Sequence, residues 1–137
     1  MPVVGLSAGV SALDAGEYQT CAIQVGTVVC WGQNAGAVHS NLTPAEVADT
    51  SGTYAVTTGG NLTCALRKAD ARGGDGGSSG SGSEPICWGT GQYGALGDGQ
   101  GKGSATPVAL FGLTLADQIS AGPEFGCAIA HGAAYRW

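Results

Sequence analysis

The sequence is poor in positive charge. Five Lys and Arg stand against ten Asp and Glu in 137 residues, which gives a formal net charge of −5. Because binding to nucleic acid or to anionic membranes relies on Lys and Arg, neither kind of partner is expected. No apolar run approaches the roughly 20 residues that span a membrane. The first residues include no basic start and no apolar signal core, so any secretion signal would lie upstream of this sequence.

Helix signals are also missing, because no window sustains an apolar period of 3.6 residues. Glycine, by contrast, accounts for 26 of the 137 residues, far above its usual share of about 7%. This composition favours short strands joined by many turns. We therefore predict an all-β chain with the length of one ordinary domain.

One stretch, residues 16–31, predicts a β-hairpin. Val25 and Gly26 take the two central positions of a type I′ turn, although β-branched Val25 resists a positive φ. Folding about this turn places Cys21 opposite Cys30 at a non-hydrogen-bonded pair, where Cα atoms approach to about 4.5 Å. This distance is compatible with a disulfide. Both faces of the hairpin are largely apolar, which favours a sheet packed between two neighbouring sheets.

The pattern of the hairpin returns twice along the chain. A glycine precedes a cysteine by five residues at Gly16–Cys21, Gly59–Cys64 and Gly122–Cys127. The three glycines lie 43 and 63 residues apart, and the second spacing falls to 49 without the 14 extra residues that separate the second cysteine pair. Periods of about 40 to 50 residues with several short strands indicate the blades of a propeller.

We divide the chain at these repeats. Residues 1–12 are expected to be the tail of a preceding blade, because their proline precedes its repeat glycine by nearly the same distance as in the later repeats. Repeat 1 occupies residues 13–55, repeat 2 residues 56–118, and the start of repeat 3 residues 119–137. Residues 69–84 form a Gly/Ser-rich insertion in repeat 2, whose composition predicts disorder.

The five cysteines divide into two pairs and one remainder. The predicted disulfides are Cys21–Cys30 and Cys64–Cys87, each directly before a tryptophan. Cys127 is predicted to be an unpaired thiol, or one that pairs outside this segment, because Arg136 stands at its partner position. Two disulfides indicate an oxidising compartment. The alternative is two pairs of free, buried cysteines in a cytosolic protein.

The sequence contains no catalytic constellation. His39 and His131 have no acid and nucleophile at a known motif spacing, and His131 is expected in an exposed hairpin turn. Asp98 is interpreted as a turn-stabilising residue, the alternative being a metal ligand. Three further acids are interpreted as solvated loop charges, not as an acid–base pair: Asp14, Glu17 and Glu124. We therefore predict no catalytic, cofactor-binding or metal-binding residue, and no enzyme activity.

Two Asn-x-Thr sequons begin at Asn41 and Asn61. Both are expected at loop or strand-entry positions, where a sugar could project into solvent. Pro44, directly after the first sequon, hinders its use, so Asn61 is the better candidate in a eukaryotic secreted protein. In a bacterial protein neither sequon would indicate glycosylation.

The combined motifs resemble the regulator of chromosome condensation repeat. They are Ala-Gly-x-x-x-Thr-Cys-Ala-Ile, Cys-Trp-Gly, Gly-x-Leu-Gly-Asp-Gly, Pro-Val and Ile-x-Ala-Gly, and they match best the extracellular-type versions with a hairpin cysteine pair. Residues 89–99 and 107–122 match closely. The resemblance implies a seven-bladed β-propeller of four-stranded antiparallel sheets, of which this chain would form about two and a half blades. It also implies that Trp31, Trp88 and Trp137 pack between blades.

The chain departs from the family pattern in three respects. The first repeat lacks the Gly-x-Leu-Gly-Asp-Gly segment, and the third lacks its second cysteine. The repeats are also too few to close a ring, and an open arc would expose two apolar faces. We therefore expect a fragment of a longer polypeptide. The alternative is that several copies, or a second chain, complete the ring.

Guanine nucleotide exchange, the best-known activity of the family, is not expected, because its loops cannot be aligned here and disulfides disfavour a nuclear location. Other family members inhibit β-lactamases or bind proteins through loops on one face. We expect a non-catalytic protein-interaction or structural module in a secreted or cell-surface assembly. The alternative is a regulatory or inhibitory propeller that binds one enzyme or GTPase. In both cases the partners are proteins, or the remaining blades of the same polypeptide, and no cofactor is expected.

Overall fold

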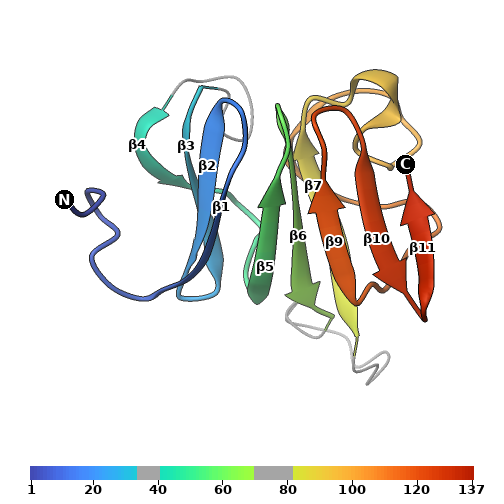
Figure 1. The fold of residues 1–137 in the computed structure, drawn as a ribbon, viewed down its shortest axis with the longest axis horizontal. Coiled ribbons are helices and arrows are strands. Elements are labelled where there is room, and N and C mark those ends of the chain that lie inside the picture. Colours follow the sequence, from blue (N-terminus) through green and yellow to red (C-terminus); the bar gives the residue numbers. More distant parts are fainter. Residues whose placement is uncertain (34–40, 70–81) are drawn as a thin grey trace.

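A computed structural model describes residues 1–33, 41–69 and 82–137 of the chain. These residues form three antiparallel sheets and one short 3-10 helix, so the predicted all-β class is confirmed. Figure 1 shows the sheets side by side in the order of the sequence. His39 lies outside the described residues.

The first sheet, blade 1, has four strands in sequence order. They are β1 (Val10–Ala15), β2 (Gln19–Gln24), β3 (Thr27–Gly32) and β4 (Asn41–Glu46). Val25 and Gly26 connect β2 to β3 with φ values of 51° and 78°, so both central residues have the positive φ of the predicted type I′ turn. The turn therefore determines the pairing of Cys21 with Cys30, which is the register observed.

The second sheet, blade 2, repeats this order. Its strands are β5 (Thr53–Thr58), β6 (Leu62–Lys68), β7 (Ser83–Gly89) and β8 (Ser104–Ala109), and the 3-10 helix η1 (Gln92–Gly94) lies between β7 and β8. The predicted insertion, residues 69–84, connects β6 to β7, and its residues 70–81 lie outside the described part. Ser83 and Glu84 at its end belong to β7, where they lie opposite Lys68 and Arg67.

The third sheet, blade 3, has three strands, which are β9 (Gln118–Ala121), β10 (Gly126–Ala130) and β11 (Ala133–Arg136). Its order is β11-β10-β9. His131 and Gly132 connect β10 to β11 with φ values of 51° and 78°, matching the turn of the first hairpin. This places His131 in the exposed hairpin turn where the sequence predicts it.

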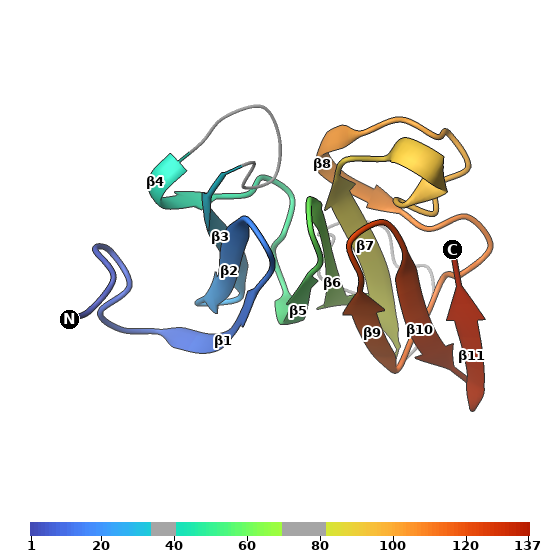
Figure 2. The same cartoon turned by 45° about the horizontal axis from the view of Figure 1, so that its top comes forward.

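The blades are arranged like adjacent segments of a fan, as the tilted view in Figure 2 shows. The first strands of consecutive blades are in contact, β1 with β5 and β5 with β9. The predicted repeat boundaries at residues 13, 56 and 119 fall inside these first strands, whereas the sheets themselves begin at Val10, Thr53 and Gln118. The division into repeats remains a prediction, and the sheets give the structural blades.

The apolar core lies between the blades. One cluster joins the hairpin of blade 1 to blade 2, and two further clusters join blade 2 to blade 3. Leu62, Ala65 and Ile86 are completely buried although they lie on opposite faces of blade 2. Burial on both faces was predicted for the hairpin of residues 16–31 and is seen in blade 2, whereas in blade 1 only the face that carries Cys21 packs against another described blade.

Candidate interaction surface

The two cysteine pairs lie at equivalent positions in blades 1 and 2. Disulfides join Cys21 to Cys30 and Cys64 to Cys87, and the Cα atoms are 4.1 Å apart in each pair. We call the side of a blade that carries these cysteines its cysteine face. The opposite side carries the tryptophan that follows the second cysteine, and we call it the tryptophan face.

The cysteine faces of blades 1 and 2 each pack against the tryptophan face of the next blade. Cys21 and Cys30 share a cluster with Trp88 of blade 2, and all three are at most 1% exposed. In the same way, Cys64 and Cys87 pack near Trp137 of blade 3. The disulfides therefore stiffen the hairpin surfaces on which consecutive blades stack.

The tryptophans do not all occupy this environment. Trp88 is completely buried between two blades, as predicted. Trp137 is partly buried against blade 2, and its indole Nε1 donates a hydrogen bond to the Ala95 carbonyl over 3.0 Å. Trp31 is only half-buried, because no blade among the described residues packs on its face of blade 1.

The repeat glycines allow the first strands to approach closely. A Cβ atom added to Gly16 would overlap the carbonyl oxygen of Gly59, and one added to Gly59 would overlap the carbonyl oxygen of Gly122. At Gly122 the added Cβ would instead meet the aromatic ring of Phe125 at 2.6 Å. The first two glycines therefore meet the backbone of a following blade, and the third meets a side chain of its own blade.

A hydrogen bond joins the first strands of each pair of blades. The Thr58 N–H donates to Asp14 Oδ2 over 2.7 Å, and the Ala121 N–H donates to Thr57 Oγ1 over 3.2 Å. Asp14 and Thr57 each precede their repeat glycine by two residues. The interpretation of Asp14 as a solvated loop charge was therefore wrong, because it lies in β1 and accepts a hydrogen bond from blade 2.

Among the described residues, no blade packs on the cysteine face of blade 3. Cys127 lies opposite Arg136 in the register of the two disulfides and forms no disulfide with the described residues. A cavity of about 220 Å³ opens on this face beside Cys127, Ser120 and Ile129. The guanidinium of Arg136 lies 4.8 Å from the centre of the Phe125 ring. The face combines apolar groups with a cation and is open to solvent.

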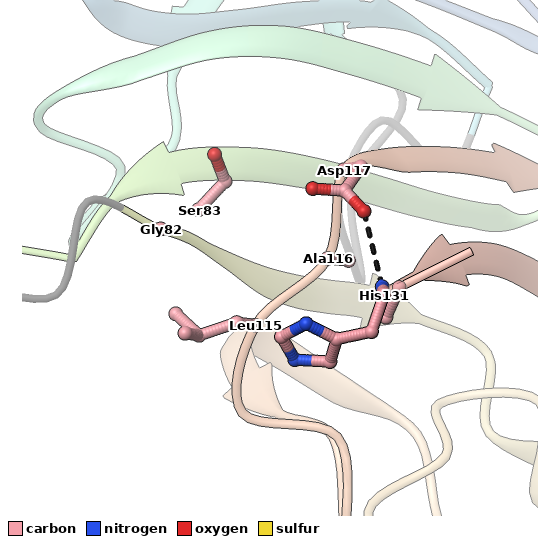
Figure 3. A pocket seen from close by; sticks show the side chains of 7 residues that line it. Gly82, Ser83, Leu115, Ala116, Asp117 and His131 are labelled. Atoms are coloured by element: carbon pink, nitrogen blue, oxygen red, sulfur yellow. Dashed lines mark hydrogen bonds between the residues drawn. The ribbon is translucent and has the colours of Figure 1, made fainter. Parts of the chain in front are cut away.

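A smaller cavity, of about 100 Å³, contains a serine, an aspartate and a histidine. Figure 3 shows that they are not arranged for nucleophilic catalysis, because the imidazole of His131 points away from the Asp117 carboxylate. That carboxylate accepts a hydrogen bond from the backbone N–H of His131 over 3.2 Å. The Ser83 hydroxyl is hydrogen-bonded to the Tyr54 hydroxyl. No Ser-His-Asp relay of the kind used in acyl transfer is formed here.

The other acids singled out in the sequence, Asp98, Glu17 and Glu124, take structural or solvated positions. Asp98 Oδ1 accepts a hydrogen bond from the Gln100 N–H over 2.9 Å, which agrees with its interpretation as a turn-stabilising residue. Glu17 and Glu124 are exposed, as predicted. Within the described ranges, no group of three or more His, Cys, Asp or Glu side chains could hold a metal ion.

Glu17 acts on its neighbour Tyr18. It raises the pKa of the Tyr18 phenol, first through a side-chain hydrogen bond and then because its negative charge disfavours the phenolate. The shift adds to an ordinary tyrosine pKa that already keeps the phenol protonated at neutral pH.

Both sequon asparagines lie where a strand begins. Asn61 directly precedes β6 and is half-buried, and its backbone carbonyl accepts a hydrogen bond from the Thr90 N–H over 2.9 Å. Asn41 begins β4. Glycosylation at either residue stays a prediction.

One buried ion pair was missed in the sequence. Arg67, which is 3% exposed, donates from Nε to Glu84 Oε2 over 2.7 Å and from Nη1 to the Asp49 carbonyl over 3.0 Å. The predicted disordered insertion includes Glu84, but this residue lies in β7 opposite Arg67. The charge on Arg67 is the signal that could have identified the pair, because a buried arginine requires a partner.

The described residues contain no helix that is long and apolar enough to cross a membrane. No family model matches the sequence, and no curated protein matches it.

Solved structures match the whole arrangement of blades. Human WBSCR16 is 18% identical with a TM-score of 0.75, and the match covers 100% of this chain and 35% of that one. Yeast RCC1 (Prp20), solved bound to Kap60, is 18% identical with a TM-score of 0.67 over 94% of this chain and 32% of its own. The ectodomain of the receptor kinase CR4 from Physcomitrella patens is 24% identical with a TM-score of 0.61, over 99% of this chain and 31% of its own.

The chain spans about a third of the length of the solved structures that it matches. It is a partial β-propeller with the blade fold of the regulator of chromosome condensation repeat. The resemblance seen in the motifs is thus confirmed at the level of the fold.

Proposed function

We propose that this chain is a non-catalytic protein-interaction or structural part of a propeller that works outside the cell or at its surface. The observation that carries the proposal is the position of the two disulfides. They lie in the stacking faces of blades 1 and 2, where the cysteines are at most 1% exposed. Disulfides persist in oxidising compartments and are rare in the cytosol and nucleus.

Two further observations support this proposal. The net charge of −5 makes nucleic acid an unfavourable partner. The solved CR4 structure is the ectodomain of a receptor kinase, which is an extracellular setting for a matching arrangement of blades. We extend the proposal to a closed ring of seven blades, in which this chain supplies about two and a half, and to a glycan on Asn61.

The loops after β7 and β8 offer a surface for a protein partner. Tyr93 is 86% exposed and Phe111 is 85% exposed. The two loops are joined because the Phe111 N–H donates to the Gly97 carbonyl over 2.7 Å. Exposed aromatic side chains on a braced loop suit the central contacts of protein interfaces, where Tyr and Trp are enriched.

Counting the free thiols of the native protein tests whether it comes from an oxidising compartment. The protein is isolated from its own source, denatured without reductant, alkylated and weighed. We expect alkylation of Cys127 alone, and alkylation of all five cysteines after reduction. Five reactive thiols before reduction would contradict the extracellular proposal. Added hexose mass on the peptide that contains Asn61 would support the glycan.

A photo-reactive phenylalanine analogue at position 93 tests the interaction. We expect a discrete cross-linked product with a protein of the extracellular fraction, competed by unlabelled chain and lost when Phe111 is replaced by Ala. The matched control is Leu42→Ala, because Leu42 is 93% exposed but lies in blade 1. An equal loss in both variants, or a product that unlabelled chain does not compete, would contradict a role of this loop.

The second candidate is a regulatory or inhibitory propeller that binds one enzyme or GTPase. Its support is the match to yeast Prp20, whose solved structures concern binding to Kap60, Gsp1p and histones. An intracellular protein with five free thiols and one tightly bound enzyme would favour this candidate over the first.

A further inference from the structure

One position differs in kind between the three hairpins. It follows by three residues the cysteine that all three hairpins share, and it is Gln24 in blade 1, Arg67 in blade 2 and Ala130 in blade 3. In each blade it is one of the last two residues of its strand. Two blades thus carry a long polar side chain at a position where the third carries only a methyl group.

The two long side chains donate hydrogen bonds to the connection that enters their own blade. Gln24 Nε2 donates to the carbonyls of Gly5 and Ala8, over 3.0 Å in each case. Arg67 Nη1 donates to the Asp49 carbonyl over 3.0 Å. A donor at this position therefore fills the space between the hairpin and the connection.

In blade 2 the donor is a cation, and it has a carboxylate as a second partner. Arg67 Nε donates to Glu84 Oε2 over 2.7 Å, and the arginine is 3% exposed. A buried guanidinium requires such partners because its charge is costly to remove from water. The arrangement in blade 2 thus consists of a guanidinium, a carboxylate and a backbone carbonyl.

In blade 3 the same place is a cavity. The Ala130 side chain is too short to reach the connection, and it lines the cavity of about 100 Å³ together with Ser83, Asp117 and His131. This volume has room for about three water molecules, or for a planar group of the size of a guanidinium. In Figure 3 the Asp117 carboxylate and the Ser83 hydroxyl lie at one edge of the cavity, and the His131 imidazole lies at the other.

The connection into blade 3 also differs beside the cavity. In blades 1 and 2 the residue seven positions before the repeat glycine is Gly9 or Gly52, with a φ of 76°, and its carbonyl accepts a hydrogen bond from an amide of the hairpin. In blade 3 this residue is Leu115, which has no positive φ. The equivalent amide, that of His131, donates to Asp117 Oδ2 instead, over 3.2 Å. Blade 3 therefore has a carboxylate where the other two blades have a backbone carbonyl.

This carboxylate has no cation as a partner among the described residues. The hydrogen bond from the His131 N–H engages Oδ2 of Asp117, and no described group donates to Oδ1. Lys68 lies opposite Ser83 and is exposed, but within the described part of the chain no ion pair joins it to Asp117. The cavity thus borders an acceptor that is free to form charge-assisted hydrogen bonds.

We propose that the cavity beside Ala130 binds the guanidinium group of an arginine side chain of a partner protein. The guanidinium takes the place that Arg67 fills in blade 2, and Asp117 takes the part of Glu84. Arginine is favoured over lysine because its planar guanidinium donates in several directions at once. The inference rests on the proposed function, because it assumes that the partner is a protein.

Titration with Nα-acetyl-arginine amide tests the site. The methyl signals of Ala130 and Leu115 report binding in NMR spectra at about pH 8, where the His131 imidazole is neutral. We expect saturable shifts of both signals. Nα-acetyl-citrulline amide has the same shape without the charge and should bind at least about tenfold more weakly. Equal affinity for the citrulline or the lysine analogue would overturn the assignment to a guanidinium.

Asp117→Asn tests the carboxylate, because it removes the charge and keeps the shape. The variant should bind the arginine analogue at least about tenfold more weakly, as expected for the loss of a hydrogen bond between charged groups. The matched control is Glu124→Gln, which removes an exposed charge at the other end of β10. An equal loss of affinity in both variants would overturn the role of Asp117.

Filling the cavity from within gives a test that needs no ligand. Ala130→Arg supplies the guanidinium of blade 2 and should abolish binding of the arginine analogue. In a double-mutant cycle with Asp117→Asn, followed by thermal unfolding, the new side chain should couple favourably to Asp117. Ala134→Arg adds the same charge at an exposed residue opposite Ile129 and should show no coupling. Absence of coupling for Ala130→Arg would overturn the inference.

A smaller substitution covers the case in which Ala130→Arg does not fold. Ala130→Gln follows the example of Gln24, whose amide donates to the connection into blade 1. It should also prevent binding of the arginine analogue, because the amide occupies the same space. Unchanged binding in a folded Ala130→Gln protein would overturn the location of the site.

Failure of this inference differs in its results from failure of the proposed function. A chain that does not bind the arginine analogue but still forms the competed photo-cross-link at position 93 would overturn the arginine site and leave the protein-interaction role standing. Binding that is lost in Asp117→Asn, in a chain without that cross-link, would support the site and contradict only the role of the loop that carries Tyr93.

Discussion

The same hairpin forms two different environments in this molecule. In blade 1, its cysteine face is covered by blade 2. In blade 3, its cysteine face is covered by no described blade, and we call it the open face. In the interface, Cys21 and Cys30 are bridged and at most 1% exposed. On the open face, Cys127 is half-buried and unbridged within the described residues, and an arginine replaces its partner. Both bridges thus lie in faces on which another blade packs, whereas Arg136 lies on a face that no described blade covers.

The largest expected effect comes from removing a bridge on the stacked side. Cys64→Ser with Cys87→Ser should lower the free energy of unfolding by about 3.5 kcal/mol, and Cys21→Ser with Cys30→Ser by about 2.7 kcal/mol, because the first bridge closes the longer loop. Urea unfolding under oxidising conditions measures both values. In excess reductant the variants should match the parent, and a difference that survives reduction would show that the serines destabilise by another route.

Alanine substitutions at the repeat glycines should destabilise a stacked face more than the open face, because the added Cβ atom meets backbone in the first and a side chain in the second. Gly59→Ala should destabilise by roughly 3 kcal/mol, because its Cβ would overlap the backbone of blade 3, which cannot move freely. Gly122→Ala should cost only about 1 kcal/mol, since the Phe125 side chain can rotate away. Thermal unfolding compares the pair, and equal losses would show that glycine flexibility, not close approach, is what matters.

Restoring the missing cysteine should make the open face resemble the stacked ones. Arg136→Cys places a thiol opposite Cys127 in the register of the native bridges, and the new disulfide should stabilise by up to about 2.7 kcal/mol, because its loop is as long as that of Cys21–Cys30. Thiol titration should then find no free cysteine. Ala134→Cys is the control, because Ala134 lies opposite Ile129. A reactive Cys127 in the Arg136→Cys protein would contradict the equivalence of the three hairpins.

The smallest single effect should be at Ser120, the last in a series of substitutions at the hydrogen-bonding positions of the first strands. Asp14→Ala should cost about 2 kcal/mol, because it leaves the Thr58 N–H without its charged acceptor, and Thr57→Ala about 1 kcal/mol. Ser120→Ala should change the free energy of unfolding by less than about 0.5 kcal/mol, as for most surface substitutions. Denaturant unfolding at low protein concentration measures all three. A cost for Ser120→Ala equal to that of Thr57→Ala would show that position 120 already has a partner in the monomer.

Local features of the hairpins could be predicted from the sequence because they depend on residues close together in the chain. The pairing of Cys21 with Cys30 followed from the turn at Val25 and Gly26 alone, and the structure confirms it. The repeat spacing in turn predicted the blades, since equal spacing reflects equal supersecondary units.

Contacts between blades could not be predicted in the same way. Asp14 looks like any surface acid in the sequence, and only the packing of β1 beside β5 brings it to the Thr58 N–H. The end of the insertion was misplaced for a related reason, because Glu84 enters β7 opposite Arg67 and completes a buried ion pair. Both features depend on residues far apart in sequence, which composition and spacing do not encode.

The hairpin of blade 2 carries 14 more residues between its cysteines than that of blade 1, yet the Cα atoms of both bridged pairs are 4.1 Å apart. Because the disulfide holds the two strands together at the cysteine pair, the geometry of the stacking face does not depend on the length of the hairpin tip. Doubling the length of a flexible loop costs only about 0.6 kcal/mol. For protein engineering, the connection between β6 and β7 is accordingly a graft point, where an epitope, a tag or a small sensor peptide can replace the native residues without disturbing the blades.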